Sequence, residues 1–150
     1  MELIVRIGSD PTSWVVPDSS YESVAAQLGQ ATGPLELPVT APLGGRLVLS
    51  PRAAGSVALI QPSGGVWQTH DWNPGHDAAP TAPLVYLASP AGAGQSAVYA
   101  VSSNVNAMTV AQDIKTAMTD KTAVTFQVHD TTGTGLLVID GATLPFAVVC

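Results

Sequence analysis

The sequence predicts an α+β, β-rich fold built from two tandem similar units of roughly ββαβββ order, joined by a Gly/Pro-rich linker. Short apolar runs separated by glycine and proline recur along the 150 residues, and two longer stretches have the spacing of helices. The order of these elements is the same in both halves, which is the pattern of an internal duplication. The predicted boundaries are residues 1–61 for the first β-rich unit, 62–83 for the linker or loop, and 84–150 for the second β-rich unit.

The first half contains one predicted helix and five predicted strands. The helix covers about residues 19–31, where apolar residues recur every three or four positions and form one stripe. The residues of this stripe are Tyr21, Val24, Ala25 and Leu28. The strands are Leu3–Ile7, Ser13–Val16, Leu35–Thr40, Arg46–Leu49 and Ser56–Ile60. Ser19 and Glu22 have the spacing of a capping box, so we expect Ser19 to cap the helix.

The second half repeats this order of elements. Its helix covers about residues 106–118, with Thr109 and Gln112 as the capping-box candidate. The residues of its apolar stripe are Ala107, Val110, Ala111 and Ile114. The strands are Leu84–Leu87, Ala97–Val101, Ala123–His129, Leu136–Ile139 and Phe146–Val149.

The strand that follows each helix alternates between apolar and polar residues. The apolar residues are Leu35, Leu37 and Val39 in the first half and Val124, Phe126 and Val128 in the second. Such alternation predicts a half-buried strand with its apolar face turned inward. A glycine turn comes next in both halves, after which Leu47 and Leu49 correspond to Leu137 and Ile139. Because Pro38 has no N–H for a sheet ladder, we expect its strand at an edge or a bulge, whereas the second strand can lie centrally.

Composition and charge argue against several classes of protein. Charged residues make up 11% of the chain, against about 25% in an ordinary soluble domain. The net charge is −6, and five Lys and Arg residues are too few for a basic stripe, so we expect no nucleic-acid and no membrane-surface partner. A mean hydropathy of +0.29 argues against disorder. So few charges are typical of secreted proteins, obligate assemblies and subunits packed in a larger particle.

No targeting or membrane-spanning segment is predicted. The N-terminal residues lack a basic region followed by a long apolar one, and no apolar run approaches the roughly 20 residues that span a bilayer. The location is therefore left open, with a virion as one candidate. Cys150 is the only cysteine, and we favour a small buried residue at a strand end over an intermolecular bridge or a reactive thiol.

The predicted linker contains the strongest candidates for an interaction site. It has no periodicity, and about 22 residues is long for a passive connection, which favours a functional or mobile segment. Trp67 and Trp72, two of the three tryptophans, lie in it. Large aromatic side chains in an irregular segment typically anchor it to something, so both are candidate interaction residues.

A polar cluster in the same segment is the one candidate for metal chemistry. Its members are His70, Asp71, His76 and Asp77. Imidazole and carboxylate groups suit Zn or Mn, but no helix or strand fixes the two histidines on one face. We therefore favour solvated turn residues and predict no metal site. We also predict no catalytic residue and no cofactor, because the chain lacks a G-x-S-x-G elbow and a G-K-[ST] phosphate loop.

Three functions remain as hypotheses. The favoured one is a non-enzymatic structural or assembly protein with protein partners or self-association, such as a capsid-decorating or tail-associated subunit of a phage virion. The order strand, strand, helix, strand, strand resembles that of β-grasp modules. That resemblance implies a second hypothesis, a soluble adaptor that binds one partner protein by edge-strand addition. The third is a metal-dependent enzyme that uses the loop from His70 to Asp77.

Overall fold

Ten strands and three helices form the described part of the chain. The computed structural model describes residues 3–8, 13–17, 20–40, 44–61, 83–88, 97–102, 105–130 and 133–150. The strands are β1 (Leu3–Ile7), β2 (Ser13–Val16), β3 (Leu35–Val39), β4 (Gly45–Leu49), β5 (Val57–Ile60), β6 (Leu84–Leu87), β7 (Ala97–Val101), β8 (Ala123–Asp130), β9 (Gly133–Asp140) and β10 (Phe146–Val149). The helices are α1 (Tyr21–Gln30), α2 (Pro51–Ala54) and α3 (Ala107–Asp120).

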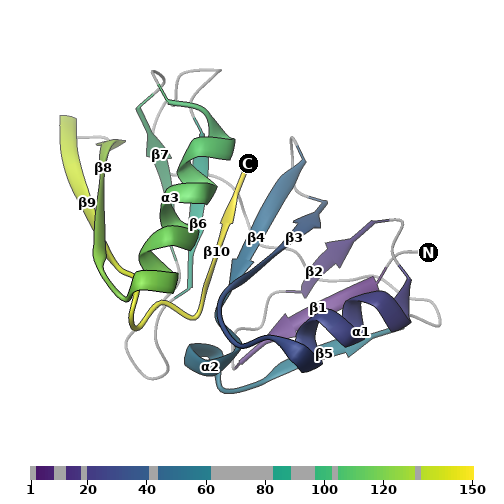
Figure 1. The fold of residues 1–150 in the computed structure, drawn as a ribbon. Helices are drawn as coiled ribbons and strands as arrows, with labels where there is room; N and C mark the ends of the chain where they lie inside the picture. The colour runs from purple at the N-terminus through teal and green to yellow at the C-terminus, as the bar shows by residue number, and fades with distance from the viewer. Residues whose placement is uncertain are drawn as a thin grey trace.

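The strands form two antiparallel sheets (Figure 1). A three-stranded sheet has the order β2-β1-β5, and a seven-stranded sheet has the order β3-β4-β10-β6-β7-β8-β9. The larger sheet contains strands from both halves of the sequence, because β4 of the first half pairs with β10 of the second. An isolated bridge between Val15 and Thr40 links the edge of the smaller sheet to the end of β3.

The β-rich α+β character predicted from the sequence is confirmed. Each predicted strand is present, and α1 and α3 begin and end within two residues of the predicted bounds. β3, which contains Pro38, is the last strand at its end of the larger sheet, whereas β8 lies between β7 and β9, as expected. The short helix α2 was not predicted, although Pro51 at its first turn and Gly55 just after its end are typical helix boundaries.

The predicted capping residue is wrong by one position in α1 and by three positions in α3. The Ser20 hydroxyl, not that of Ser19, accepts a 3.3 Å hydrogen bond from the Ser23 N–H. In α3 the Asn106 side chain accepts a 2.8 Å bond from the Thr109 N–H. Each capping residue stands directly before the first helical residue, where its side chain can reach the third N–H. A capping-box pattern alone does not locate that boundary.

The larger sheet has a hydrophobic core on each face. Phe146 and Val148 of β10 belong to one core and Ala147 and Val149 to the other, as the alternation of a strand requires. The first core also contains β1, β2 and α1. The second is covered by α3, which contacts β4, β8, β9 and β10. Among the described helices, none is long and apolar enough to span a membrane.

Candidate interaction surface

The pairing of β4 with β10, here called the inner junction, joins the two halves of the sequence. Its register runs from Phe146 opposite Leu49 to Val149 opposite Arg46. Val48 lies opposite Ala147, and both side chains are fully buried in the core beneath α3. Main-chain hydrogen bonds and apolar burial on both faces therefore hold the two halves together.

An aromatic cluster lies on the other face of the inner junction. The Trp14 ring from β2 lies 5.0 Å from the Tyr86 ring and 6.0 Å from the Phe146 ring, edge-on to both. Tyr86 and Phe146 stack at 5.8 Å. All three are almost completely buried, and since Trp14 comes from the first half and the other two from the second, the core is shared between the halves.

The hairpin of β8 and β9 lies at the opposite end of the larger sheet from β3 (Figure 1). Its inward face pairs Phe126 with Leu137 and belongs to the core beneath α3. Its outward face pairs Thr125 with Val138 and Gln127 with Leu136. Leu136 is 68% exposed and Val138 58% exposed. The outward face of β9 therefore presents two large apolar side chains to solvent.

Four strands lie at the ends of the two sheets. β2 and β3 approach each other and are joined by the Val15–Thr40 bridge, whereas β5 and β9 have no strand beside their outer edge among the described residues. The segment Val57–Ile60 contains no charge, and the only charged residue of β9 is Asp140 at its end. Exposed edge strands usually carry charges or proline that prevent pairing with another chain. β3 has both protections, Pro38 and a 3.2 Å ion pair between Glu36 and Arg46 of β4. β5 and β9 lack them.

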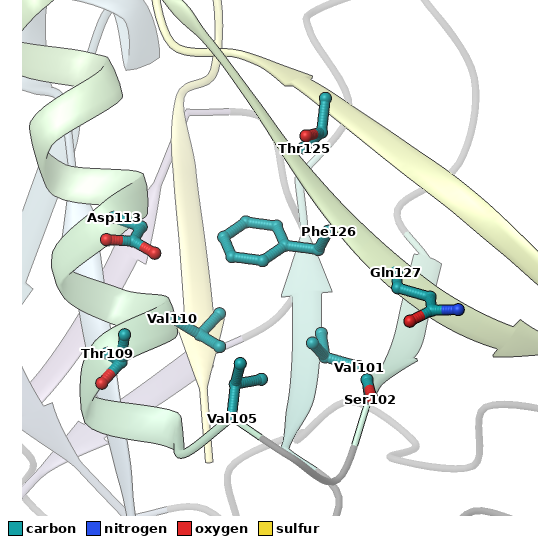
Figure 2. A pocket seen from close by; sticks show the side chains of 9 residues that line it. All are labelled: Val101, Ser102, Val105, Thr109, Val110, Asp113, Thr125, Phe126 and Gln127. Atoms are coloured by element: carbon teal, nitrogen blue, oxygen red, sulfur yellow. The ribbon is translucent and has the colours of Figure 1, made fainter.

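A shallow hollow lies between α3 and β8 (Figure 2). The Phe126 ring points toward α3, and three valines lie around it: Val101, Val105 and Val110. Asp113 is the one carboxylate among its described lining residues. The hollow measures about 200 Å³, less than the roughly 300–1,000 Å³ of a small-molecule site. The other lining residues carry hydroxyl or amide groups: Ser102, Thr109, Thr125 and Gln127.

A second hollow of about 440 Å³ lies where the start of α3 meets the end of the β3–β4 hairpin. Ala107 and Met108 line it from α3, and Pro38 and Arg46 from the hairpin. Met108 is 65% exposed. Prolines, glycines and aliphatic side chains dominate the lining, which therefore offers contact area rather than reactive groups.

The candidate residues predicted in the linker lie outside the described residues. These are Trp67, His70, Asp71, Trp72, His76 and Asp77. Their roles as interaction anchors or metal ligands therefore remain predictions. Within the described ranges, no three His, Cys, Asp or Glu side chains come together to hold a metal ion.

Cys150 follows β10 and exchanges two backbone hydrogen bonds with Leu84, of 2.9 and 3.0 Å. Its side chain is buried, and this burial raises the pKa of the thiol from 9.0 to about 11. A protonated, buried thiol is a weak nucleophile. The structure therefore favours the interpretation of Cys150 as a packing residue.

Sequence reasoning missed the exposure of Leu136 and Val138. The run Leu136–Ile139 is apolar throughout, which is typical of a strand buried on both faces. A signal was nevertheless present in the neighbouring strand. Thr125 and Gln127 predict a polar outward face for β8, and the residues of β9 opposite them share that face. Comparison of the chain with protein-family models, curated proteins and solved structures gives no match.

Proposed function

We propose that this chain is a non-enzymatic structural or assembly protein made of two tandem units, whose partners are other protein subunits. The observation that carries the proposal is the nearly uncharged edge of β9, which no described strand covers, together with the exposed Leu136 and Val138. Unpaired main-chain groups beside exposed apolar side chains favour pairing with another strand. Complete burial of a Leu or Val side chain contributes about 1.5–3 kcal/mol, so a partner that covers this face gains stability chiefly from the side chain that it encloses fully.

Strand order supports the division into two tandem units. In the first half, the first strand (β1) lies between the last strand (β5) and the second strand (β2). In the second half the order β10-β6-β7 has the same arrangement. The third and fourth strands of each half form an antiparallel hairpin, β3–β4 or β8–β9.

The residue registers of the two hairpins also correspond. Leu37 pairs with Leu47 in the first hairpin, and Phe126 pairs with Leu137 in the second. Two positions further on, Val39 pairs with Gly45, and Val128 pairs with Gly135. The segments 45–49 and 135–139 read GRLVL and GLLVI. One alignment therefore relates both pairs of strands.

The contact between the second and third strands supports the same alignment. Thr40 comes directly after Val39 and bridges to Val15 of β2. His129 comes directly after Val128, and its backbone pairs with that of Ala100 in β7. Each long helix also begins after a residue whose side chain caps the third N–H. Agreement at separate contacts is the pattern that a structural duplication produces.

A capsid-decorating or tail-associated subunit of a phage virion is the form of assembly protein that we favour. The low charge content of 11% suits a protein that buries surface against neighbouring subunits. Two similar units also provide repeated contacts, which are useful on a symmetric particle. The adaptor hypothesis uses the same free edges, with a strand of an unrelated protein in place of another subunit.

The test is the mass of the purified protein in solution, measured by light scattering over a wide range of concentration. We expect mass to increase with concentration, or a defined oligomer. The double substitution Leu136→Thr and Val138→Thr keeps strand propensity but removes the exposed apolar surface, so it is expected to abolish association.

Met108→Thr is the matched control, because Met108 is equally exposed but lies on α3. This variant is expected to associate like the unmodified chain. A monomer at every concentration would contradict the assembly proposal and favour the adaptor. Equal weakening by the double substitution and by Met108→Thr would indicate non-specific adhesion and would also contradict it.

A further inference from the structure

We propose that β9 of one copy pairs antiparallel with β5 of a second copy, so that the contact between copies repeats the inner junction. The inference rests on the proposed assembly function and specifies its partner, strand and register. The inner junction joins the fourth strand of the first half to the last strand of the second half. The remaining fourth strand is β9 and the remaining last strand is β5. Neither has a strand beside its outer edge in the described structure, whereas the other two end strands, β2 and β3, are bridged to each other.

The register of the inner junction predicts the register between copies. Val15 of β2 bridges to the residue after β3, and Ala100 of β7 pairs with the equivalent residue of β8, so Val15 and Ala100 correspond. Val15 pairs with Ile4 and Ala100 pairs with Leu84, so Ile4 and Leu84 also correspond. Ile4 pairs with Ile60, and Leu84 forms backbone hydrogen bonds with Cys150, so Ile60 corresponds to Cys150. Counting back along the last strand, Val57 of β5 therefore corresponds to Ala147 of β10, and Leu59 corresponds to Val149.

The positions of β9 follow from the hairpin alignment, in which Val138 corresponds to Val48 and Leu136 to Arg46. In the inner junction, Val48 lies opposite Ala147 and Arg46 lies opposite Val149. Val138 of one copy therefore lies opposite Val57 of the second copy. Leu136 lies opposite Leu59 of the second copy.

The proposed contact explains why apolar residues are exposed on β9. Val48 is completely buried because α3, the helix of the adjoining half, covers β4. Val138 has the same place on β9 but is 58% exposed, since none of the three described helices covers that face. In the proposed contact, α1 of the second copy is the counterpart of α3. It covers Val138, next to the half-buried Val57 and Leu59 of its own sheet.

The two free edges lie at opposite ends of the molecule in Figure 1, with β9 at the left and β5 at the lower right. When β9 of one copy pairs with β5 of another, the dimer still has one unpaired β9 edge and one unpaired β5 edge. Addition therefore continues until a ring closes or a filament forms. A symmetric β9–β9 dimer, in contrast, stops at two copies.

Cysteine cross-linking under mild oxidation tests the pairing. Residues directly opposite in an antiparallel sheet have Cα atoms about 4.5–5.5 Å apart, within the range of a disulfide. In a Cys150→Ala background, the double variant Val138→Cys and Val57→Cys is expected to give a ladder of covalent oligomers. A variant with only one of the two substitutions has a single cysteine at each contact and is expected to form no covalent oligomers.

The matched control moves one cysteine by two residues on the same face of β9. In the variant Leu136→Cys and Val57→Cys the two residues are diagonal neighbours, about 7–8 Å apart, and are expected to cross-link weakly or not at all. A cooperative thermal transition of each variant shows that it is folded.

The other outcomes separate this inference from the assembly proposal. Covalent dimers from Val138→Cys alone would mean β9–β9 pairing, which overturns the inference but keeps self-association. Concentration-dependent mass without a ladder would likewise overturn only the inference. A monomer that forms no cross-link would overturn both proposals.

Discussion

The hairpins β3–β4 and β8–β9 have the same register but different surroundings. In β3–β4, the flank of β4 pairs with β10, and Val48 is completely buried. In β8–β9, the flank of β9 is free among the described residues, and Val138 is 58% exposed. The inward faces are alike, since Leu47 and Leu137 both lie in or against a core. The difference lies on the opposite face, which α3 covers at Val48 of β4.

In each hairpin, the alternation of apolar residues determines which face turns inward, whereas the adjoining strands and helices determine whether the other face is buried. Alternating apolar residues place the inward face regardless of what lies beside the hairpin. The outward face is buried on β4, where β10 lies alongside and α3 covers the strand, and it is exposed on β9. Leu136 and Val138 are exposed on β9, whereas Val48 of β4 is buried, and exposed apolar side chains of this kind are the basis of the proposed association.

The largest expected effect comes from breaking the inner junction. Phe146 is almost completely buried and contacts both Trp14 and Tyr86. Phe146→Ala is expected to lower the free energy of unfolding by about 3–5 kcal/mol, because it removes a large side chain and leaves a cavity. Urea denaturation measures the change, and a loss below about 1 kcal/mol would show that the aromatic cluster does not hold the halves together.

A smaller effect compares the same substitution on the two hairpins. Val48→Ala is expected to cost about 2 kcal/mol, the burial of two methyl groups plus the cavity they leave. Val138→Ala is expected to change stability by less than about 0.5 kcal/mol when measured in dilute solution, because the side chain has little to pack against there. Similar losses at both positions would contradict the structural difference between the hairpins.

The thiol of Cys150 gives a comparison by reactivity and pH. Burial raises its pKa from 9.0 to about 11, so a thiol reagent is expected to react slowly with Cys150 and rapidly with Val138→Cys on the open face. Above pH 9 the unfolded chain releases the thiol proton first, so this group lowers stability as the pH rises toward 11 and has no effect below 9. Denaturation midpoints of the unmodified chain and of Cys150→Ala, compared across that interval, measure the effect. A pH dependence that Cys150→Ala leaves unchanged would show that this thiol is not responsible.

Much of the fold could be predicted from the sequence because its signals are local. The alternation around Leu37 and Phe126 and the helical stripes around Val24 and Val110 determine strands, helices and inward faces. Pro38 predicted an edge because its missing N–H is a property of one residue. The helix α2 was missed because its four residues are too few for any periodicity.

The pairing of β4 with β10 could not be predicted in the same way. Both strands are short apolar runs, which indicate burial on two faces but not which strand lies alongside. In the candidate surface, Leu136 and Val138 belong to a predicted strand. Their exposure could be predicted only from the polar residues that lie opposite them on β8. The anchors predicted at Trp67 and Trp72 lie outside the described residues.

The central claim is that the contact between two copies repeats the inner junction. Substituting arginine separately at two positions of the outward face of β9 tests it most directly. In the inner junction the place of Leu136 is held by Arg46, whose side chain is 47% exposed, and the place of Val138 by the buried Val48. If β9 forms the same contact with a second copy, Leu136→Arg is tolerated. Val138→Arg then weakens association about a hundredfold or more, since it buries an unpaired charge.

The measurement is the concentration at which association is half complete, determined by light scattering for both variants and the unmodified chain. We expect a small change for Leu136→Arg and loss of association for Val138→Arg. Because Leu136 is the larger and more exposed of the two, a merely sticky face predicts the reverse order. Equal losses, or a larger loss for Leu136→Arg, would contradict the proposed repetition of the inner junction between copies.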